Sequence, residues 1–203
     1  MSEKLIEIEG PAGIIEASYR DSKDATGAAL ICHPHPLYGG SMYDAVVACM
    51  CRAVAQLNIA SLSFNFRGVG RSQGQHDQGV GEVQDVLFLC RWLKEQEGVE
   101  VIYLGGYSFG AMIALTAAGE LDVPLEHLML VAPPIPGDSG SLDLQCPTTI
   151  IAGKQDNIVD IDAVQNWLST ASSPAEMIEL EAADHFFMGF HKEIESALVG
   201  RLA

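Results

Sequence analysis

The fold of this chain is indicated by one pentapeptide, Gly106-Tyr107-Ser108-Phe109-Gly110, which follows an apolar run at residues 101–104. A run of Ala, Met, Ile and Leu comes directly after it, so the pentapeptide predicts a sharp turn from a strand into a helix. Small residues two before and two after the serine are needed where such a turn leaves no room for side chains. A serine at this turn stands at the edge of a sheet, which makes Ser108 a candidate nucleophile.

A second pentapeptide with the same spacing, Gly70-Arg71-Ser72-Gln73-Gly74, occurs earlier in the chain. Ser72 lies several residues beyond the nearest apolar run, and the polar stretch that follows it does not begin a helix. A match to this spacing is informative only between a strand and a helix. We therefore interpret Ser72 as part of a glycine-rich structural loop and Ser108 as the nucleophile.

Short apolar runs alternate with longer helical patterns on both sides of Ser108, and the first two runs flank a turn at Gly10-Pro11-Ala12-Gly13 that predicts a hairpin. The predicted strands are residues 5–8, 14–19, 28–32, 59–65, 101–104, 128–132, 148–152 and 177–180, and the predicted helices are 43–57, 81–96, 109–118, 161–169 and 190–202. Strands separated by helices pair in parallel. We predict an α/β protein with a single domain over residues 1–203, whose mostly parallel eight-stranded sheet is flanked by helices. Ligand sites in such sheets lie outside the carboxyl ends of the strands.

A serine hydroxyl becomes a good nucleophile only when a base removes its proton and a third group orients the base. His185 follows the last predicted strand by a short loop, so it is the candidate base. Asp156 lies four residues beyond the preceding strand and is the candidate acid. Asp160 and Asp162 fit the cap and first turn of the next helix instead. Asp184 competes with Asp156, but a side chain rarely reaches the ring of its neighbour in sequence.

Attack on a carbonyl creates an oxyanion that needs two hydrogen-bond donors. The backbone N–H of Phe109 is the first candidate, because it stands at the start of the helix after the nucleophile. The second donor is expected in the loop after strand 28–32, which reads His33-Pro34-His35-Pro36-Leu37-Tyr38-Gly39-Gly40. The two prolines have no N–H, which leaves His35 or Leu37, and we favour His35. His33 and His35 have a spacing that also suits a metal, but no Cys or carboxylate cluster lies nearby in sequence, so we predict no metal site.

Apolar and aromatic residues flank the candidate site, and we expect four of them to line an acyl pocket: Leu37, Tyr38, Tyr107 and Phe186. Packing into the core explains these side chains equally well. Arg67 and Arg71 lie in the glycine-rich loop, where contact with an anionic substrate and bracing of the loop are the two interpretations. We favour bracing.

The composition excludes several classes of protein. The 203 residues carry a formal net charge of −16, which opposes binding to nucleic acid or to an anionic membrane surface. Ten of these excess negative charges lie in residues 121–203, which also supply Asp156 and His185. The first residues lack the apolar core of a signal peptide, and the five cysteines are expected to be buried thiols. We therefore expect a soluble cytoplasmic protein.

Taken together, the motifs resemble the α/β-hydrolase superfamily. The motifs that carry the resemblance are Cys32-His33-Pro34-His35-Pro36-Leu37-Tyr38-Gly39-Gly40, Phe64-Asn65-Phe66-Arg67-Gly68-Val69-Gly70-Arg71-Ser72, Gly106-Tyr107-Ser108-Phe109-Gly110, Gly153-Lys154-Gln155-Asp156 and Ala183-Asp184-His185-Phe186-Phe187. The first two are similar to small bacterial hydrolases related to dienelactone hydrolase. Dienelactone hydrolases themselves use cysteine where this chain has Ser108, so lactone chemistry is not implied.

The resemblance implies a serine hydrolase of carboxylesterase or thioesterase type that needs no cofactor and acts on a small-molecule acyl substrate. Many relatives carry a helical lid after the sixth strand, whereas residues 133–147 are too few for one here, so we expect no lid domain and an open site. Two alternatives stay open, an amidase or peptidase and a binding protein that keeps the hydrolase fold without catalysis. The sequence also leaves a homodimer open.

Overall fold

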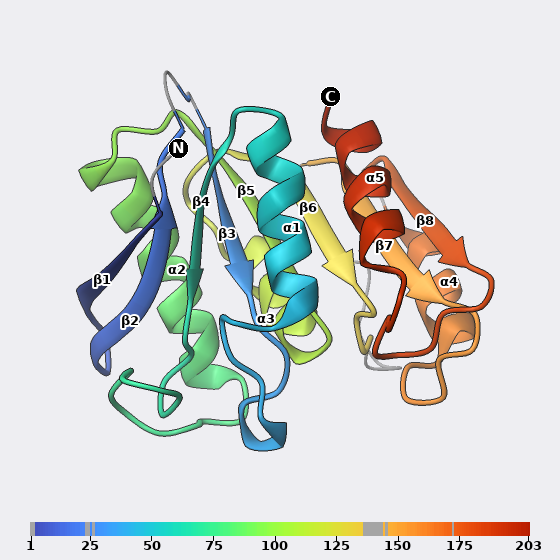
Figure 1. Ribbon diagram of the computed structural model, residues 1–203, viewed down its shortest axis with the longest axis horizontal. Coiled ribbons are helices and arrows are strands. Elements are labelled where there is room, and N and C mark those ends of the chain that lie inside the picture. The colour runs from blue at the N-terminus through green and yellow to red at the C-terminus, as the bar shows by residue number, and fades with distance from the viewer. Residues whose placement is uncertain (1–2, 23–24, 26, 136–143, 145, 172) are drawn as a thin grey trace.

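The predicted strands all lie in one sheet in the computed structural model (Figure 1). The structure describes residues 3–22, 25, 27–135, 144, 146–171 and 173–203. The strands are β1 (Glu3–Gly10), β2 (Gly13–Arg20), β3 (Gly27–Cys32), β4 (Ala60–Phe64), β5 (Val101–Tyr107), β6 (Leu125–Val131), β7 (Thr148–Gly153) and β8 (Ala175–Leu180). The helices are α1 (Ala45–Gln56), α2 (Val80–Gln96), α3 (Phe109–Ala118), α4 (Ile161–Thr170) and α5 (His191–Leu202), with a short 3-10 helix η1 (Pro36–Tyr38).

The sheet is mixed, in the order β1-β2-β4-β3-β5-β6-β7-β8. The strands from β4 to β8 in this order pair in parallel, as predicted for strands joined by helical crossovers. The predicted hairpin of β1 and β2 adds the antiparallel edge, because β2 also pairs antiparallel with β4. The parallel strands therefore end at one common edge, where their following loops meet.

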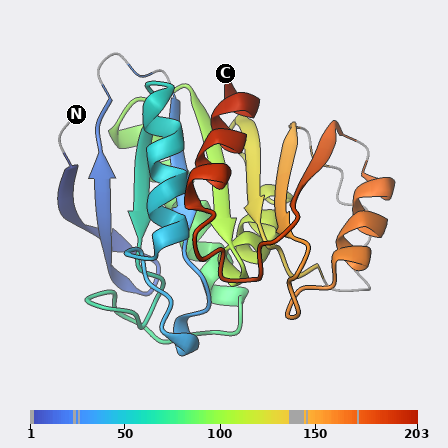
Figure 2. The same ribbon diagram turned by 45° about the vertical axis from the view of Figure 1, so that its right-hand side comes forward.

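Helices cover both faces of this sheet, which confirms the predicted α/β architecture. Helices α1 and α5 pack side by side on one face, and α2 and α3 pack together on the other (Figure 1). Helix α4 lies beside β8 at the far edge, which Figure 2 shows from the side. All six residues of β3 are buried, as are the six of β7, because these strands are covered on both faces.

Two details differ from the sequence-based expectations. Strand β5 extends to Tyr107 instead of ending at residue 104, because Gly105 and Gly106 remain in register beside Ile31 and Cys32 of β3. The 3-10 helix η1, whose first residue is Pro36, was not predicted. The connection between β6 and β7 lies largely outside the described residues, which do not include 136–143 or 145.

Within the described residues, no helix combines the length and the apolar character needed to cross a bilayer. All five cysteines are free and buried, as expected.

Candidate active site

Ser108 stands at the junction of β5 and α3 in a conformation that side chains rarely adopt, with φ 54° and ψ −121°. The turn brings Gly106 and Gly110 so close that a Cβ on Gly106 would lie 2.3 Å from the carbonyl oxygen of Gly110. Gly110 in turn packs on the carbonyls of Cys32 and His33, each 2.4 Å from an added Cβ. The spacing of the pentapeptide is thus explained by two close approaches of backbone.

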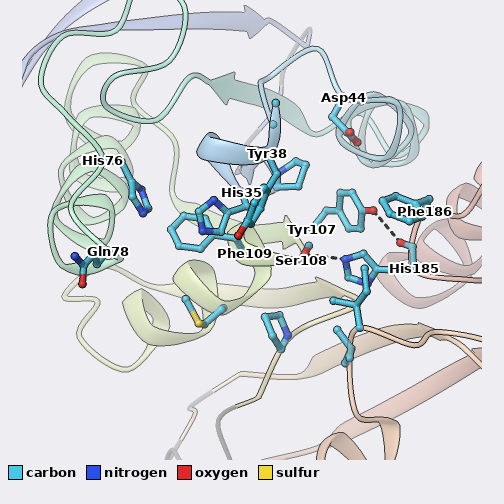
Figure 3. Close-up of a pocket in the computed structure, with 17 residues that line it drawn as sticks. His35, Tyr38, Asp44, His76, Gln78, Tyr107, Ser108, Phe109, His185 and Phe186 are labelled. Carbon is cyan, nitrogen blue, oxygen red and sulfur yellow. Dashed lines mark hydrogen bonds between the residues drawn. The ribbon is translucent and has the colours of Figure 1, made fainter.

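The three predicted side chains meet at the carboxyl edge of the sheet. Oγ of Ser108 lies 3.0 Å from Nε2 of His185 (Figure 3). Nδ1 of His185 in turn lies 2.7 Å from Oδ2 of Asp156. Because a carboxylate oxygen only accepts, Nδ1 carries the proton of a neutral His185 and Nε2 is free to accept from the serine. Ser108 follows β5, Asp156 follows β7 and His185 follows β8, in the order expected for this architecture.

Asp156 is held by its other oxygen. Oδ1 accepts hydrogen bonds from the backbone N–H groups of Ile158 at 2.8 Å and Val159 at 2.9 Å. The side chains of Asp156 and His185 are 2% and 6% exposed, so water does not compete strongly for their contact. Asp184, the competing acid, instead accepts from the backbone N–H of Phe186 at 3.0 Å and shapes its own turn.

The residues set aside as helix caps behave as expected. Asp160 caps α4 by accepting from the N–H of Ala163 at 3.2 Å, and Asp162 lies in the first turn of that helix.

Ser72, the serine of the second pentapeptide, is used by the backbone. Its hydroxyl accepts from the N–H of Glu16 in β2 and donates to the carbonyl of Asn65, the residue after β4, so it is not directed to the site.

The two candidate oxyanion donors lie on the same side of the site. Phe109 is the first residue of α3, and the first amides of a helix have no acceptor within it. The rings of Phe109 and His35 are 4.8 Å apart, which places the loop after β3 beside the start of α3. The N–H of Leu37 donates to Nδ1 of His35 at 3.2 Å, so Leu37 is already engaged and His35 is the better of the two alternatives.

A cavity of about 730 Å³ opens over these groups. Its lining is mainly apolar and includes Pro34, His35, Tyr38, Gly39, Gly40, Asp44, His76, Gln78, Tyr107, Ser108, Phe109, Met112, Pro134, Ile158, Val159, His185 and Phe186. Three of the four predicted pocket residues belong to it, and Tyr38 and Phe186 stand at its mouth with exposures of 88% and 59%. Leu37 does not line the cavity, because η1 turns its side chain into solvent, where it is 69% exposed.

Several lining residues were missed from the sequence. His76 and Gln78 lie in the polar stretch after Ser72, which was interpreted only as a structural loop. Met112 lies one helical turn after Ser108. Its spacing from Ser108 therefore places it on the same face of α3, which is a signal that the sequence already carries. Asp44 accepts a hydrogen bond from the N–H of Val46 at the start of α1, and it also lines the cavity.

His33 is buried and forms hydrogen bonds through both ring nitrogens. Nε2 accepts from the N–H of Phe66 at 3.0 Å, and Nδ1 lies 2.6 Å from the carbonyl oxygen of Pro34. Burial lowers the pKa of His33 to about 4, so the ring is neutral near pH 7. Both nitrogens are thus used by the backbone.

Neither arginine of the glycine-rich loop lines the cavity. Arg67 forms a bidentate pair with Asp85 of α2, at 2.8 and 2.7 Å, and Arg71 pairs with Glu7 of β1. Both arginines brace the loop, as favoured, although through carboxylates instead of backbone carbonyls.

Comparisons with known proteins agree with this geometry. A family model for the alpha/beta hydrolase fold matches residues 35–145. A solved alpha-beta serine hydrolase homologue from Coxiella burnetii is 38% identical, with a TM-score of 0.92 over 100% of this chain and 99% of that one. A Xanthomonas campestris structure described as an a/b serine hydrolase without lid is 32% identical, with a TM-score of 0.88 over 100% of this chain and 95% of that one.

A third relative extends the match to a protein without an assigned activity. An uncharacterised protein of Rickettsia prowazekii is 33% identical, over 95% of this chain and 86% of its own length. These matches do not single out the dienelactone hydrolase group, which stays a prediction. The pentapeptide turn, the mixed sheet and the family match agree that this chain belongs to the α/β-hydrolase fold family.

Proposed function

We propose that this protein is a serine hydrolase that cleaves a carboxylic ester or thioester through an acyl-enzyme. The observation that carries the proposal is the continuous contact from Ser108 through His185 to Asp156, at 3.0 and 2.7 Å. A serine, a base and an orienting acid within hydrogen-bond distance are what nucleophilic acyl transfer requires. The solved serine hydrolase relatives support the same class of reaction.

In this mechanism Ser108 attacks the substrate carbonyl while Nε2 of His185 takes the hydroxyl proton. The N–H groups of Phe109 and His35 donate to the oxyanion of the tetrahedral intermediate. Collapse of the intermediate breaks the bond to the alcohol or thiol, which receives the proton from His185. Water then attacks the acyl-enzyme, again losing its proton to His185, and the acid and free Ser108 are released. Asp156 stabilises the protonated imidazole throughout.

The shape of the cavity supports a small or medium acyl group. Its volume of about 730 Å³ is in the range of small-molecule sites, and its wall is mainly apolar. The exposed side chains of Tyr38, Ile158 and Phe186 form an open apolar mouth. The net charge of −16 disfavours polyanionic substrates.

The test is a hydrolysis panel of p-nitrophenyl esters, acyl thioesters and anilides with wild type and two serine variants. Ser108→Ala should reduce kcat by about ten-thousandfold or more on every substrate that wild type cleaves. Ser72→Ala is the matched control, since it removes the serine of the second pentapeptide; it should lose stability and keep its activity per folded molecule.

Labelling with a fluorophosphonate separates the alternatives. Wild type and Ser72→Ala should be labelled and Ser108→Ala should not. An unlabelled wild type without turnover would favour the binding-protein alternative, and preferential cleavage of anilides would move the assignment to an amidase.

A further inference from the structure

At the end of the cavity remote from His185, the wall contains a second histidine, His76, with a buried carboxylate behind it. Figure 3 shows His76 and Gln78 at that end, with His35 and Phe109 between them and Ser108. The His76 ring lies 5.1 Å from the His35 ring and 5.6 Å from the Phe109 ring. The proposed mechanism gives no role to the side chain of His35 or to that of His76.

The partner of His76 is Glu82, a fully buried residue in the first turn of α2. Its Oε1 accepts from the N–H of Asp77 and its Oε2 from the N–H of Gly79, both at 2.9 Å. Burial acts to raise the pKa of Glu82, but the hydrogen bonds from these N–H groups hold the pKa below its usual value. Glu82 is therefore an ionised acceptor near pH 7.

The position of Glu82 fixes the proton on His76. The buried Nδ1 of His76 lies 2.8 Å from Oε1 of Glu82, without the alignment of a hydrogen bond. Two acceptors would repel at this distance, so Nδ1 carries a proton and Nε2 of the neutral ring is an acceptor. The side chain keeps 14% exposure and lines the cavity, so its unburied edge faces the space where substrate would lie.

His35 has the opposite arrangement. Its Nδ1 accepts from the N–H of Leu37, which leaves the proton on Nε2. Burial lowers the pKa of His35, so this ring is neutral near pH 7. Within the described part of the chain, Nε2 of His35 and Nε2 of His76 have no hydrogen-bond partner.

We propose that His35 and His76 form a subsite that binds a hydroxyl group of the substrate, with Nε2–H of His35 as donor and Nε2 of His76 as acceptor. A hydroxyl both donates and accepts, so it matches one donor and one acceptor on adjacent rings. Phe109 and Met112 line the path from Ser108, so the hydroxyl would be carried on an apolar chain. The ionised Glu82 behind His76 and a net charge of −16 disfavour a carboxylate there.

The inference rests on the proposed hydrolase activity and names a substrate class for it. It is tested with matched esters whose chain ends in a methyl, a hydroxyl or a carboxylate, placed in one set on the acyl side and in another on the alcohol side. Wild type should prefer the hydroxyl over the methyl by about tenfold in kcat/KM in one of the two sets, the value of one well-formed hydrogen bond.

The decisive variant is His76→Asn, because an Asn amide occupies the position of Nδ1 and keeps a donor for Glu82 while Nε2 is lost. It should fold like wild type and lose more kcat/KM on hydroxyl-ended esters than on methyl-ended ones, so that the preference for hydroxyl falls to about onefold to twofold. Gln75→Asn, on the exposed part of the same loop, is the control and should keep the preference.

Three outcomes overturn the subsite: no hydroxyl preference in wild type, a preference that His76→Asn retains, or a carboxylate preference that His76→Asn removes, which would identify an anion site instead. Failure of the hydrolase proposal is distinct, because no methyl-ended ester would then be cleaved in a manner dependent on Ser108.

Discussion

The phenol hydroxyl of Tyr107 donates a 2.8 Å hydrogen bond to the backbone carbonyl of His185. Tyr107 directly precedes Ser108, so this bond ties the loop that carries His185, the proposed base, to the residue beside the proposed nucleophile. Burial raises the pKa of Tyr107, so the hydroxyl stays protonated as a donor. Tyr107 is therefore a positioning residue as well as part of the cavity wall.

Replacing Tyr107 with phenylalanine should lower kcat by roughly tenfold with a smaller change in KM, because small displacements of a base cost rate more than binding. Steady-state kinetics on one ester would measure this split. Tyr103→Phe, on the same strand but outside the cavity lining, should leave both parameters unchanged. A wild-type kcat in the Tyr107 variant would show that the His185 loop does not depend on this bond.

Asp156→Asn should reduce kcat by about a thousandfold or more while preserving the fold. The Asn oxygen can still accept from Ile158 and Val159, but its amide then faces Nδ1 of His185 and favours the wrong tautomer. Asp184→Asn is the comparison, since Asn can also accept from the N–H of Phe186, and its kcat should stay within about threefold of wild type. Equal losses in the two variants would contradict the assignment of the acid.

Arg67→Met should destabilise the protein by about 3 kcal/mol, because Asp85 is 1% exposed and would lose its countercharge. Arg71→Met should change stability by less than about 1 kcal/mol, since the Arg71 side chain is 71% exposed. Urea denaturation measures both. Combining Arg67→Met with Asp85→Leu should recover most of the loss, and no recovery would mean that the loop needs the ion pair itself.

His33 should make the protein less stable as the pH falls from 6.5 toward 4. Its folded pKa is lowered from 6.5 to about 4, so over this interval the unfolded chain binds a proton that the folded chain does not. The loss amounts to about 3 kcal/mol over the interval, and it vanishes above pH 6.5, where both states are neutral. Urea unfolding across this pH range should show the slope in wild type and a flatter curve in His33→Gln, which keeps an acceptor for Phe66. Parallel curves would exclude His33 as the source.

The sequence was sufficient to predict the positions of residues that directly follow a strand. Ser108, Asp156 and His185 each follow an apolar strand, and parallel strands share one carboxyl edge, so strand ends in the sequence become neighbours in space. Ser72 could be separated from Ser108 because only one of the two serines stands between a strand and a helix.

What the sequence could not give depends on contacts between distant segments. His76 reaches the cavity because Glu82 and the loop geometry turn it toward His35, about forty residues earlier in the chain. The link from Tyr107 to His185 joins residues 78 positions apart. The position of Leu37 outside the cavity lining has a local cause instead, because the 3-10 turn η1 decides where its side chain points.

The three residues of the proposed catalytic contact are distributed unevenly across the sheet. Ser108 follows a central strand, whereas His185 follows β8, the outermost strand, whose six residues are only half-buried. The loops after β7 and β8 are tied by backbone bonds from Lys154 to Leu180 and from Gln155 to Ala183. Local opening is least costly where few contacts are buried, so this edge is expected to fray before the centre. Acid and base would then be lost together while the nucleophile and the core remain folded, so loss of activity during mild denaturation would report fraying of one sheet edge rather than collapse of the protein.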